Sequence, residues 1–452
     1  MTKGLPSEVI VIGAGVFGIS TAIAIGKRYP ETKVHVIDRY EPPVEDGTSV
    51  DTTRCLRVDY TNDIYYNLAK ESMAIIEADP AIAPFFHKVG MSFVYDGNSD
   101  KWEDIWIKGL ASSRHVNAEN PSKTVLYNNN VEVFQRIHGK DHSPKTAEEL
   151  GRETKWNKGY TNLSNGYIDA KKSMKAYYER AKTFSNIDFT FKEVDKIVYE
   201  EGTNKATGVA FKDQSLITSD LVVVAAGAWT SKLVDLYDLA KTSAIEVAWL
   251  KVTKEEEEQW KNMSITTNFS TGINLFPPYE GEIKTLRRSA GYKNSVEIPS
   301  PNPLAKDGSS IKISYPRTIL SNPNDWIPED AELALRENLK EIMPSLADRP
   351  FDRTKVCWLT QTPSANFIID FHPELQNVVL ATGGSAHAWK FVPVLGDKVV
   401  DMIIGQLDPV LKDLWSWEEK TRTTLDNGSA PRMTGEPQEI SQVIRQRPAD
   451  MI

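Results

Sequence analysis

Residues 8–38 decide the fold, and they read EVIVIGAGVFGISTAIAIGKRYPETKVHVID. The apolar run Glu8–Ile12 is rich in β-branched residues, which is typical of a buried parallel strand. A glycine-rich turn follows at 13–18, and residues 19–28 have the alanines and apolar spacing of a helix. Val34–Ile37 is a second apolar run that ends at Asp38. The stretch therefore predicts a βαβ unit.

The turn has the spacing Gly13-x-Gly15-x-x-Gly18. In a dinucleotide site the first glycine permits the tight turn, the second lets backbone approach a pyrophosphate, and the third lets helix and strand pack closely. Asp38 stands 20 residues after Gly18, where a carboxylate can bind ribose hydroxyls. The alternative is a glycine-rich turn in an unrelated α/β fold. We favour dinucleotide binding, with contacts from Gly13, Gly15, Val16, Phe17, Gly18, Asp38 and Arg39.

Length and composition set broad limits on function. The chain has 452 residues, enough for two or three domains, with 40% hydrophobic and 25% charged residues. Its net charge of -9 argues against a broad nucleic-acid surface. No apolar run approaches the roughly 18 residues needed to span a bilayer, so no membrane partner is expected.

The expected location is intracellular, in the cytoplasm or a peroxisome. Two cysteines, Cys55 and Cys357, are too few for a disulfide scaffold. The start of the chain lacks the pattern of a signal peptide, and its end, Asp450-Met451-Ile452, is not the peroxisomal Ser-Lys-Leu address. We expect a monomer.

Strands of the nucleotide-binding type recur late in the chain. Asp220–Ala225 leads into Gly227 and Trp229, and Val378–Ala381 leads into Gly383 and Gly384. Between them the signals are mixed, which predicts two domains interleaved in sequence. Further expected elements are helices at 63–78, 169–183 and 393–404 and strands at 188–191 and 196–199. The predicted boundaries are 1–84, 160–240 and 350–412 for the nucleotide-binding domain, 85–159 and 241–349 for a substrate domain, and 413–452 for an extended or disordered C-terminal arm.

Single residues carry little chemistry without context. A lone cysteine such as Cys357 is most often a small buried hydrophobic residue, and lysines such as Lys284 and Lys390 are mostly solvated. The seven histidines show no metal-ligand spacing, and no Ser-His-Asp arrangement stands out. We therefore expect no metal site.

Taken together, several motifs resemble one family, the sarcosine-oxidase-like flavoprotein amine oxidases. The likeness is strongest to its fungal branch of saccharopine oxidases and fructosyl amino acid oxidases (amadoriases), and it runs from residue 8 to about 417. The motifs are VIGAGVFG at 11–18, DGTSVD at 46–51 leading to Arg54 and Arg57, AGAW at 226–229, FPP at 276–278 leading to Lys284, the segment around Cys357, and ATGGSAHAWK at 381–390.

The resemblance implies particular roles. FAD would be attached by a thioether from Cys357 to its 8α-methyl group, and Lys284 would help activate dioxygen by stabilising developing negative charge. Arg57 and Lys390 would bind the substrate carboxylate. The fold implied is a Rossmann-like α/β FAD-binding domain interleaved with a mixed-sheet α+β substrate domain, as in glutathione reductase and D-amino-acid oxidase. Further FAD contacts would come from Ser49, Arg54, Gly227, Trp229, Gly383, Gly384, His387 and Lys390.

This sequence departs from the fructosyl amino acid oxidases in its pocket. Phe276 stands where they carry an acidic residue, and Gly384 where they tend to carry aspartate. Ala386 replaces a family glycine and Trp389 a smaller aromatic residue.

The activity implied is oxidation of the C–N bond of a secondary-amine amino acid, with dioxygen reduced to hydrogen peroxide. Saccharopine, an N-methyl amino acid and a cyclic imino acid are candidate substrates. The runner-up is a fructosyl amino acid oxidase. From another class, an NAD-linked dehydrogenase or a flavin-binding protein without turnover stays open.

Overall fold

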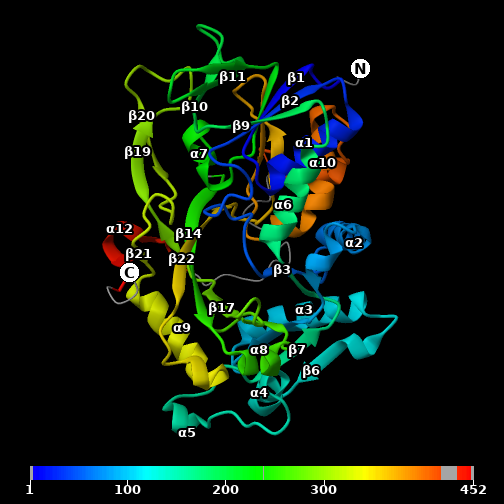
Figure 1. The fold of residues 1–452 in the computed structure, drawn as a ribbon, viewed down its shortest axis with the longest axis vertical. Coiled ribbons are helices and arrows are strands. Elements are labelled where there is room, and N and C mark those ends of the chain that lie inside the picture. The colour runs from blue at the N-terminus through cyan, green and yellow to red at the C-terminus, as the bar shows by residue number, and fades with distance from the viewer. Residues whose placement is uncertain (1–3, 238, 419–434, 449–452) are drawn as a thin grey trace.

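The computed structural model describes residues 4–237, 239–418 and 435–448. Figure 1 shows two main bodies, a helix-covered sheet near the N-terminus and a larger sheet below it, joined by the long strands β14 (Lys241–Lys251) and β22 (Arg353–Gln361). The predicted fold class, an α/β chain with an additional mixed sheet, is confirmed.

The first sheet contains six strands in the order β23-β24-β13-β1-β2-β9. All neighbours are parallel except β23 and β24, which are antiparallel. Strands β1 and β2 flank the glycine turn, β13 and β9 pair with them on either side, and β23 and β24 come from much later in the chain. The bounds are β1 (Glu8–Ile12), β2 (Lys33–Asp38), β9 (Ile187–Phe191), β13 (Leu221–Val224), β23 (Ile368–Phe371) and β24 (Val378–Thr382).

Both faces of this sheet are covered, which is why its strands are apolar throughout. Val9 and Val11 face a core with the helices α1 (Val16–Arg28), α6 (Ala170–Ala181) and α10 (Val392–Ile403). Ile10 and Ile12 face the opposite core, which includes a small antiparallel sheet. That sheet consists of β10 (Val194–Tyr199), β11 (Ala206–Phe211) and β12 (Leu216–Thr218).

The expected βαβ unit is confirmed, and the boundaries differ slightly. Helix α1 begins at Val16, three residues before the expected start, because the turn passes straight into the helix after Gly15. Helix α2 (Asp63–Ala78) has the expected bounds, and the side chain of Asn62 caps it by accepting from two backbone N–H groups.

The second sheet contains ten strands and is mixed. Strand β14 is its longest member, pairing with β17 along one side and with β22 along the other. The bounds of the others are β5 (Met91–Tyr95), β6 (Thr124–Tyr127), β7 (Lys158–Asn162), β15 (Ile265–Asn268), β16 (Ile273–Leu275), β17 (Glu282–Arg287), β18 (Tyr292–Lys293) and β25 (Gln438–Glu439).

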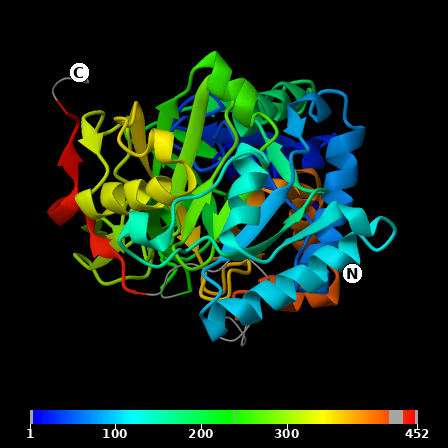
Figure 2. The same cartoon turned by 90° about the horizontal axis from the view of Figure 1, so that it is seen from below.

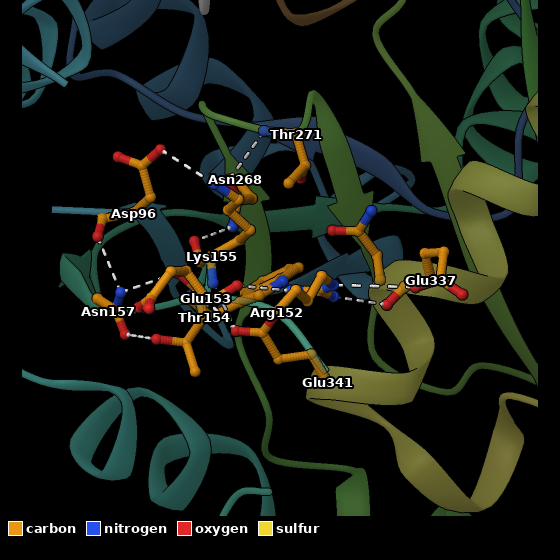
Figure 3. A network of polar contacts seen from close by, with 12 residues as sticks. Asp96, Arg152, Glu153, Thr154, Lys155, Asn157, Asn268, Thr271, Glu337 and Glu341 are labelled. Carbon is orange, nitrogen blue, oxygen red and sulfur yellow. Dashed lines mark hydrogen bonds and ion pairs between the residues drawn. The ribbon is translucent and has the colours of Figure 1, made fainter. Parts of the chain in front are cut away.

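Helices that the sequence did not predict cover this sheet. They are α3 (Asp100–Val116), α4 (Asn130–His138), α8 (Lys254–Trp260) and α9 (Glu329–Ile342). A polar network ties the segment before β7 to α9 (Figure 3). The buried Glu341 accepts hydrogen bonds from the Arg152 side chain at 2.7 Å and from the backbone of Lys155 and Trp156 at 2.7 and 3.1 Å.

The smaller elements complete the two bodies. They are β3 (Arg54–Leu56), η1 (Ala83–Phe85), β4 (Phe86–His87), η2 (Pro121–Lys123), α5 (Ala147–Leu150), β8 (Gly166–Ile168), η3 (Gly227–Trp229), α7 (Thr230–Leu233), β19 (Ser295–Pro299), β20 (Ser310–Ser314), β21 (Asp325–Trp326), η4 (Pro344–Leu346), η5 (Ala388–Phe391), α11 (Pro409–Trp415), α12 (Ile440–Val443) and β26 (Arg445–Gln446).

Two segments make contacts that the domain boundaries predicted from the sequence do not anticipate. Strand β22 falls in the segment predicted for the nucleotide-binding domain, yet it pairs with β14 in the second sheet from Arg353 to Gln361. Within the predicted C-terminal arm, residues 419–434 lie outside the described residues, while β25 pairs with β18 and β26 with β21. The domain boundaries themselves stay a prediction.

The view from below separates the two ends of the described chain. Helix α9 and the elements of 435–448 lie on one side of the molecule, and the N-terminal elements lie on the other (Figure 2). Among the described residues, none of the helices has both the length and the apolar character to cross a membrane.

Candidate active site

The glycine turn is held in one shape by its surroundings. Gly13 has a φ of +103°, and its N–H donates to the Ile37 carbonyl at 2.7 Å. A Cβ on Gly18 would lie 1.8 Å from the Gly13 carbonyl oxygen, so the third glycine is required for helix and strand to approach. At this helix N-terminus the N–H groups of Ala14 and Val16 donate to the Asp38 carboxylate at 2.7 Å and to the Ser49 hydroxyl at 3.1 Å.

A cavity opens over this turn. Most of the predicted FAD contacts line it: Gly13, Gly15, Val16, Phe17, Asp38, Arg39, Ser49, Arg54, Gly227, Trp229, Gly384 and His387. The cavity extends from Asp38 past the turn to the segment at 384–389. A cavity lined by glycine-rich backbone at a helix N-terminus fits a dinucleotide.

Four predicted cofactor contacts lie elsewhere. Gly18 packs beneath the turn, and Gly383 packs against Thr362 with a φ of +72°. Cys357 and Lys390 line a second cavity.

Polar groups at the far end of the first cavity are already organised. The Asp38 carboxylate accepts from the N–H of Ala14 and of Arg39, both at 2.7 Å, with one bond on each oxygen. Burial raises the pKa of Asp38, and the two backbone N–H groups oppose that rise. The Arg39 guanidinium binds Asp46 at 2.8 Å and lies 4.1 Å from the centre of the Trp229 ring.

The second cavity adjoins the first. The two share wall residues, namely Arg54, Leu359, Ala386, His387 and Trp389. Cys357 lies in this second wall, on β22 opposite Ile245 of β14, and its side chain is free of any disulfide. A flavin that occupied the first cavity and reached the shared wall would therefore have Cys357 within the adjoining space.

Arg57 and Lys390 meet in the second cavity, although they come from opposite ends of the chain. Both lie against one ring: the Tyr60 centroid is 4.3 Å from the Arg57 guanidinium carbon and 5.3 Å from Lys390 Nζ. Arg57 also donates to the Asp59 carbonyl, and its guanidinium lies 3.6 Å from the Asp59 carboxylate. Burial, reinforced by the Arg57 charge, lowers the pKa of Lys390 well below its usual value.

A hydrogen-bond chain fixes Lys390. Lys390 Nζ donates to the Tyr60 hydroxyl at 2.8 Å, and that hydroxyl lies 3.1 Å from His387 Nδ1. His387 Nε2 is 2.8 Å from the Ala365 carbonyl, which can only accept, so Nε2 carries the proton and Nδ1 accepts from Tyr60. Burial lowers the pKa of His387 well below its usual value, which agrees with a neutral ring.

Lys284 lies outside the wall residues of both cavities. Its buried ammonium donates to both carboxylate oxygens of Asp51 at 2.8 Å and to the Thr53 carbonyl at 2.7 Å. Burial disfavours the charged form of Asp51, but Lys284 and Arg54 outweigh it and lower the pKa of that carboxyl. Burial likewise lowers the pKa of Lys284, against the pull of Asp51. We read the two groups as a buried ion pair next to the second cavity.

The shared wall contains an unusual turn. Ser385 and Ala386 both have left-handed backbone, with φ of +46° and +61°. This conformation disfavours residues with a Cβ, so a glycine would suit Ala386 better. The Ser385 side chain helps to hold the turn, since it accepts from Thr362 N–H at 3.2 Å. Ala386 therefore places a methyl group in the wall that the two cavities share.

Three site residues were not predicted from the sequence: Asp51, Tyr60 and Arg288. Asp51 lies within the 46–57 motif segment and Tyr60 lies three residues after it, so their position next to Arg54 and Arg57 was a signal that could have identified them. Arg288 follows β17 and lines the second cavity, but nothing in the sequence separates it from its neighbour Arg287.

Comparison with known proteins agrees with this geometry. Residues 8–402 match the model of the DAO family, described as FAD dependent oxidoreductase. The chain belongs to this family. It is therefore an FAD-dependent oxidoreductase, and the first cavity is the part of the described chain that fits the FAD.

Individual relatives are distant but cover nearly the whole chain. L-saccharopine oxidase of Schizosaccharomyces pombe is 26% identical over an alignment of 427 positions that covers 92% of this chain and 94% of that protein. Monomeric sarcosine oxidase of a Bacillus species is 24% identical, over 87% of this chain and 92% of that one. A solved structure of a modified fructosyl peptide oxidase from Aspergillus nidulans superposes with a TM-score of 0.82 at 26% identity, covering 98% and 99% of the two chains.

Proposed function

We propose that this protein oxidises the C–N bond of an amino acid whose amine is secondary, using FAD held in part through a thioether to Cys357. The observation that carries the proposal is the convergence of Arg57 and Lys390 in a cavity that shares its wall with the FAD cavity. Two cations buried side by side are costly unless an anion joins them. An amino-acid carboxylate supplies that anion.

The bound FAD supplies the redox chemistry, accepting a hydride equivalent from the carbon beside the amine and passing two electrons to dioxygen to give hydrogen peroxide. Water then hydrolyses the resulting imine. The protein binds and orients the substrate: Lys390, fixed by Tyr60 and His387, and Arg57 hold the carboxylate so that the amine carbon faces the shared wall. Lys284 and Asp51 keep a cation near that wall without exposing it to bulk water.

The similarity to saccharopine and sarcosine oxidases supports a secondary amine that bears an alkyl group. The similarity in fold to a fructosyl peptide oxidase keeps a fructosyl amino acid as the second candidate. Phe276 favours the first, because its apolar ring lies under Lys284 Nζ at 3.8 Å and offers a sugar no hydrogen bond.

The decisive experiment compares an N-methyl amino acid with its decarboxylated amine in a peroxide assay. The acid should be oxidised and the amine should be a poor substrate. Lys390→Ala and Arg57→Ala should each lower kcat/KM for the acid tenfold or more, since a charged hydrogen bond contributes about 1.5–3 kcal/mol, and should barely change that for the amine. Equal oxidation of the acid and the amine by the wild type would refute the carboxylate site.

A further inference from the structure

The second cavity contains more positive charge than one carboxylate can neutralise. Arg57 has Asp59 beside it, and Lys284 has Asp51. Lys390 and Arg288 differ, because neither has a carboxylate partner among the residues that the structure describes. The hydrogen bonds of Lys390 go to two uncharged groups, the Tyr60 hydroxyl and the His387 carbonyl.

Arg288 reaches the cavity from a different element than Arg57 and Lys390. Lys390 lies in η5 and Arg57 directly follows β3 of a three-stranded sheet, whereas Arg288 directly follows β17 of the ten-stranded sheet. Its backbone N–H donates to the Gly272 carbonyl at 2.7 Å, which fixes the start of the side chain. Its neighbour Arg287 forms ion pairs with Glu246 and Asp330 and does not line the cavity. Within the described part of the chain, the Arg288 guanidinium has no side-chain hydrogen bond or ion pair.

The Arg288 side chain is half-buried, so its charge loses part of its hydration. Burial, reinforced by the charge of Arg57, lowers the pKa of Arg288 to about 10. A neighbouring anion would offset both effects, and the planar guanidinium can bind a carboxylate through two parallel hydrogen bonds. The first carboxylate of the substrate is already assigned to Arg57 and Lys390, so a second anion is needed for Arg288.

We propose that Arg288 binds a second anionic group of the substrate, so that the preferred substrate is an N-alkylated amino acid with two acidic groups. The inference rests on the proposed function and narrows its substrate class. The second carboxylate sits either on the amino-acid side chain or on the N-alkyl group. In both cases the second carboxylate binds Arg288 while the first binds Lys390.

The test uses matched acids and amides with the FAD-loaded enzyme. One pair is N-methyl-L-glutamate and N-methyl-L-glutamine, and the other is N-(2-carboxyethyl)-L-alanine and its side-chain amide. We expect kcat/KM for the acid to exceed that for the amide by about tenfold or more in at least one pair, because the amide loses a charged hydrogen bond. Arg288→Met should remove this preference, and Arg288→Lys should restore part of it.

A control removes a cation that lies on the surface. Lys293→Met, at an exposed position in β18, should keep the wild-type preference for the acid. If neither pair shows a preference for the acid, or if Arg288→Met slows acid and amide by the same factor, the assignment of Arg288 is wrong. Oxidation of N-methyl-L-alanine under those conditions would leave the proposed function intact.

A binding measurement without turnover tests the anion site at Arg288 independently of the proposed oxidase activity. Calorimetry should show that glutarate binds the holoenzyme about tenfold more tightly than glutaramate, and that Arg288→Met removes the difference. If none of the N-alkyl amino acids is oxidised, the proposed function fails, while this measurement still decides whether Arg288 binds an anion. Equal affinities for glutarate and glutaramate in the wild type would overturn the inference.

Discussion

At the scale of single residues, Cys357 gives the most direct test of how FAD is held. Its side chain lines the second cavity beside the wall shared with the first, and no disulfide competes for it. Denatured wild-type protein should keep flavin absorbance after acid precipitation, and Cys357→Ser should release the flavin. Cys55→Ser is the matched control, because Cys55 lines the same cavity, and it should retain the bound flavin. Release of FAD from denatured wild-type protein would contradict the thioether.

Lys284 is expected to assist dioxygen. In Lys284→Met the reaction of reduced flavin with dioxygen should slow by orders of magnitude, since each 1.36 kcal/mol of lost stabilisation costs roughly tenfold in rate. Reduction by substrate should change little, as stopped-flow measurement of each half-reaction would show. The variant also leaves Arg54, at 3.4 Å, as the remaining ion-pair partner of Asp51 among the described residues, so Lys284→Met/Asp51→Asn is needed to separate the lost cation from the carboxylate left behind. Equal slowing of both half-reactions would indicate a structural role.

Lys390 should make carboxylate binding depend on pH. The bound anion needs the charged ammonium, and burial with the charge of Arg57 lowers the pKa of Lys390 well below 10.5 in the free site. Affinity is therefore complete at lower pH and falls as pH rises through that lowered pKa. Of the neighbouring groups, His387 has a pKa lowered by burial and Tyr60 one raised by burial, so neither titrates in that window. Arg288, with a pKa lowered to about 10, titrates at its upper edge, and Arg288→Met in the Lys390 variants removes that contribution.

The measurement is the Kd of butyrate, which carries no amine of its own, followed by flavin absorbance across pH. Lys390→Arg should keep its affinity to higher pH than the wild type, because a guanidinium stays charged. Lys390→Met should bind weakly with little pH dependence. A wild-type Kd that stays constant up to pH 10.5 would show that the ammonium does not carry the binding.

Site residues that belong to a local motif could be predicted from the sequence, whereas those that depend on long-range contacts could not. Gly13, Gly15 and Asp38 were predictable because a local spacing determines their geometry. Arg288 was not predictable, because its role depends on its strand end meeting a cavity that is also lined by residues of 51–57. The hydrogen bond between Lys284 and Thr53 joins the same two segments across 231 residues. Lys284 was placed near the flavin by resemblance, yet its ion pair with Asp51 became visible only in the structure.

At the scale of elements, helices α1 and α10 cross with almost no space between them. A Cβ on Gly396 would lie 1.9 Å from the Ser20 carbonyl oxygen, and the Ser20 hydroxyl accepts from the Gly396 N–H at 2.6 Å. Gly396→Ala should therefore force the helices apart and lower the free energy of unfolding by about 1–3 kcal/mol. Lys398→Ala on the same helix is the control and should change the thermal midpoint little. An unchanged midpoint in Gly396→Ala would mean that the crossing can relax.

Elements of the second sheet were harder to predict than those of the first. The first sheet consists of short apolar strands covered on both faces, a pattern that stands out locally. Helix α3 has its apolar residues Trp106 and Leu110 on one face of a polar helix, and the surrounding sequence mixes strands and helices without clear breaks. Strand β22 was assigned to the FAD-binding domain by position along the chain, whereas its pairing with β14 depends on contacts across more than a hundred residues.

At the scale of the whole molecule, Glu341 links α9 to the segment that leads into β7. Glu341→Gln should lower the free energy of unfolding by about 2–3 kcal/mol, because a buried carboxylate with three donors becomes an amide with one suitable oxygen. Glu337→Gln is the matched control on the same helix, and its exposed pair with Arg152 at 3.8 Å should contribute less than about 1 kcal/mol. Urea unfolding measures both. A similar loss in the two variants would show that the network is no stronger than an ordinary surface contact.

The order of strands in the first sheet also has a consequence for biosynthesis. Strand β1 leaves the ribosome early, but its neighbour β13 follows only at residue 221, and β24, which pairs with β13, only at residue 378. The last residue lining the FAD cavity is Trp389. A nascent chain therefore carries its glycine turn for most of translation without the walls that complete the site. FAD loading must follow synthesis of nearly the whole polypeptide, and until then the early apolar strands depend on local contacts or on chaperones to avoid aggregation.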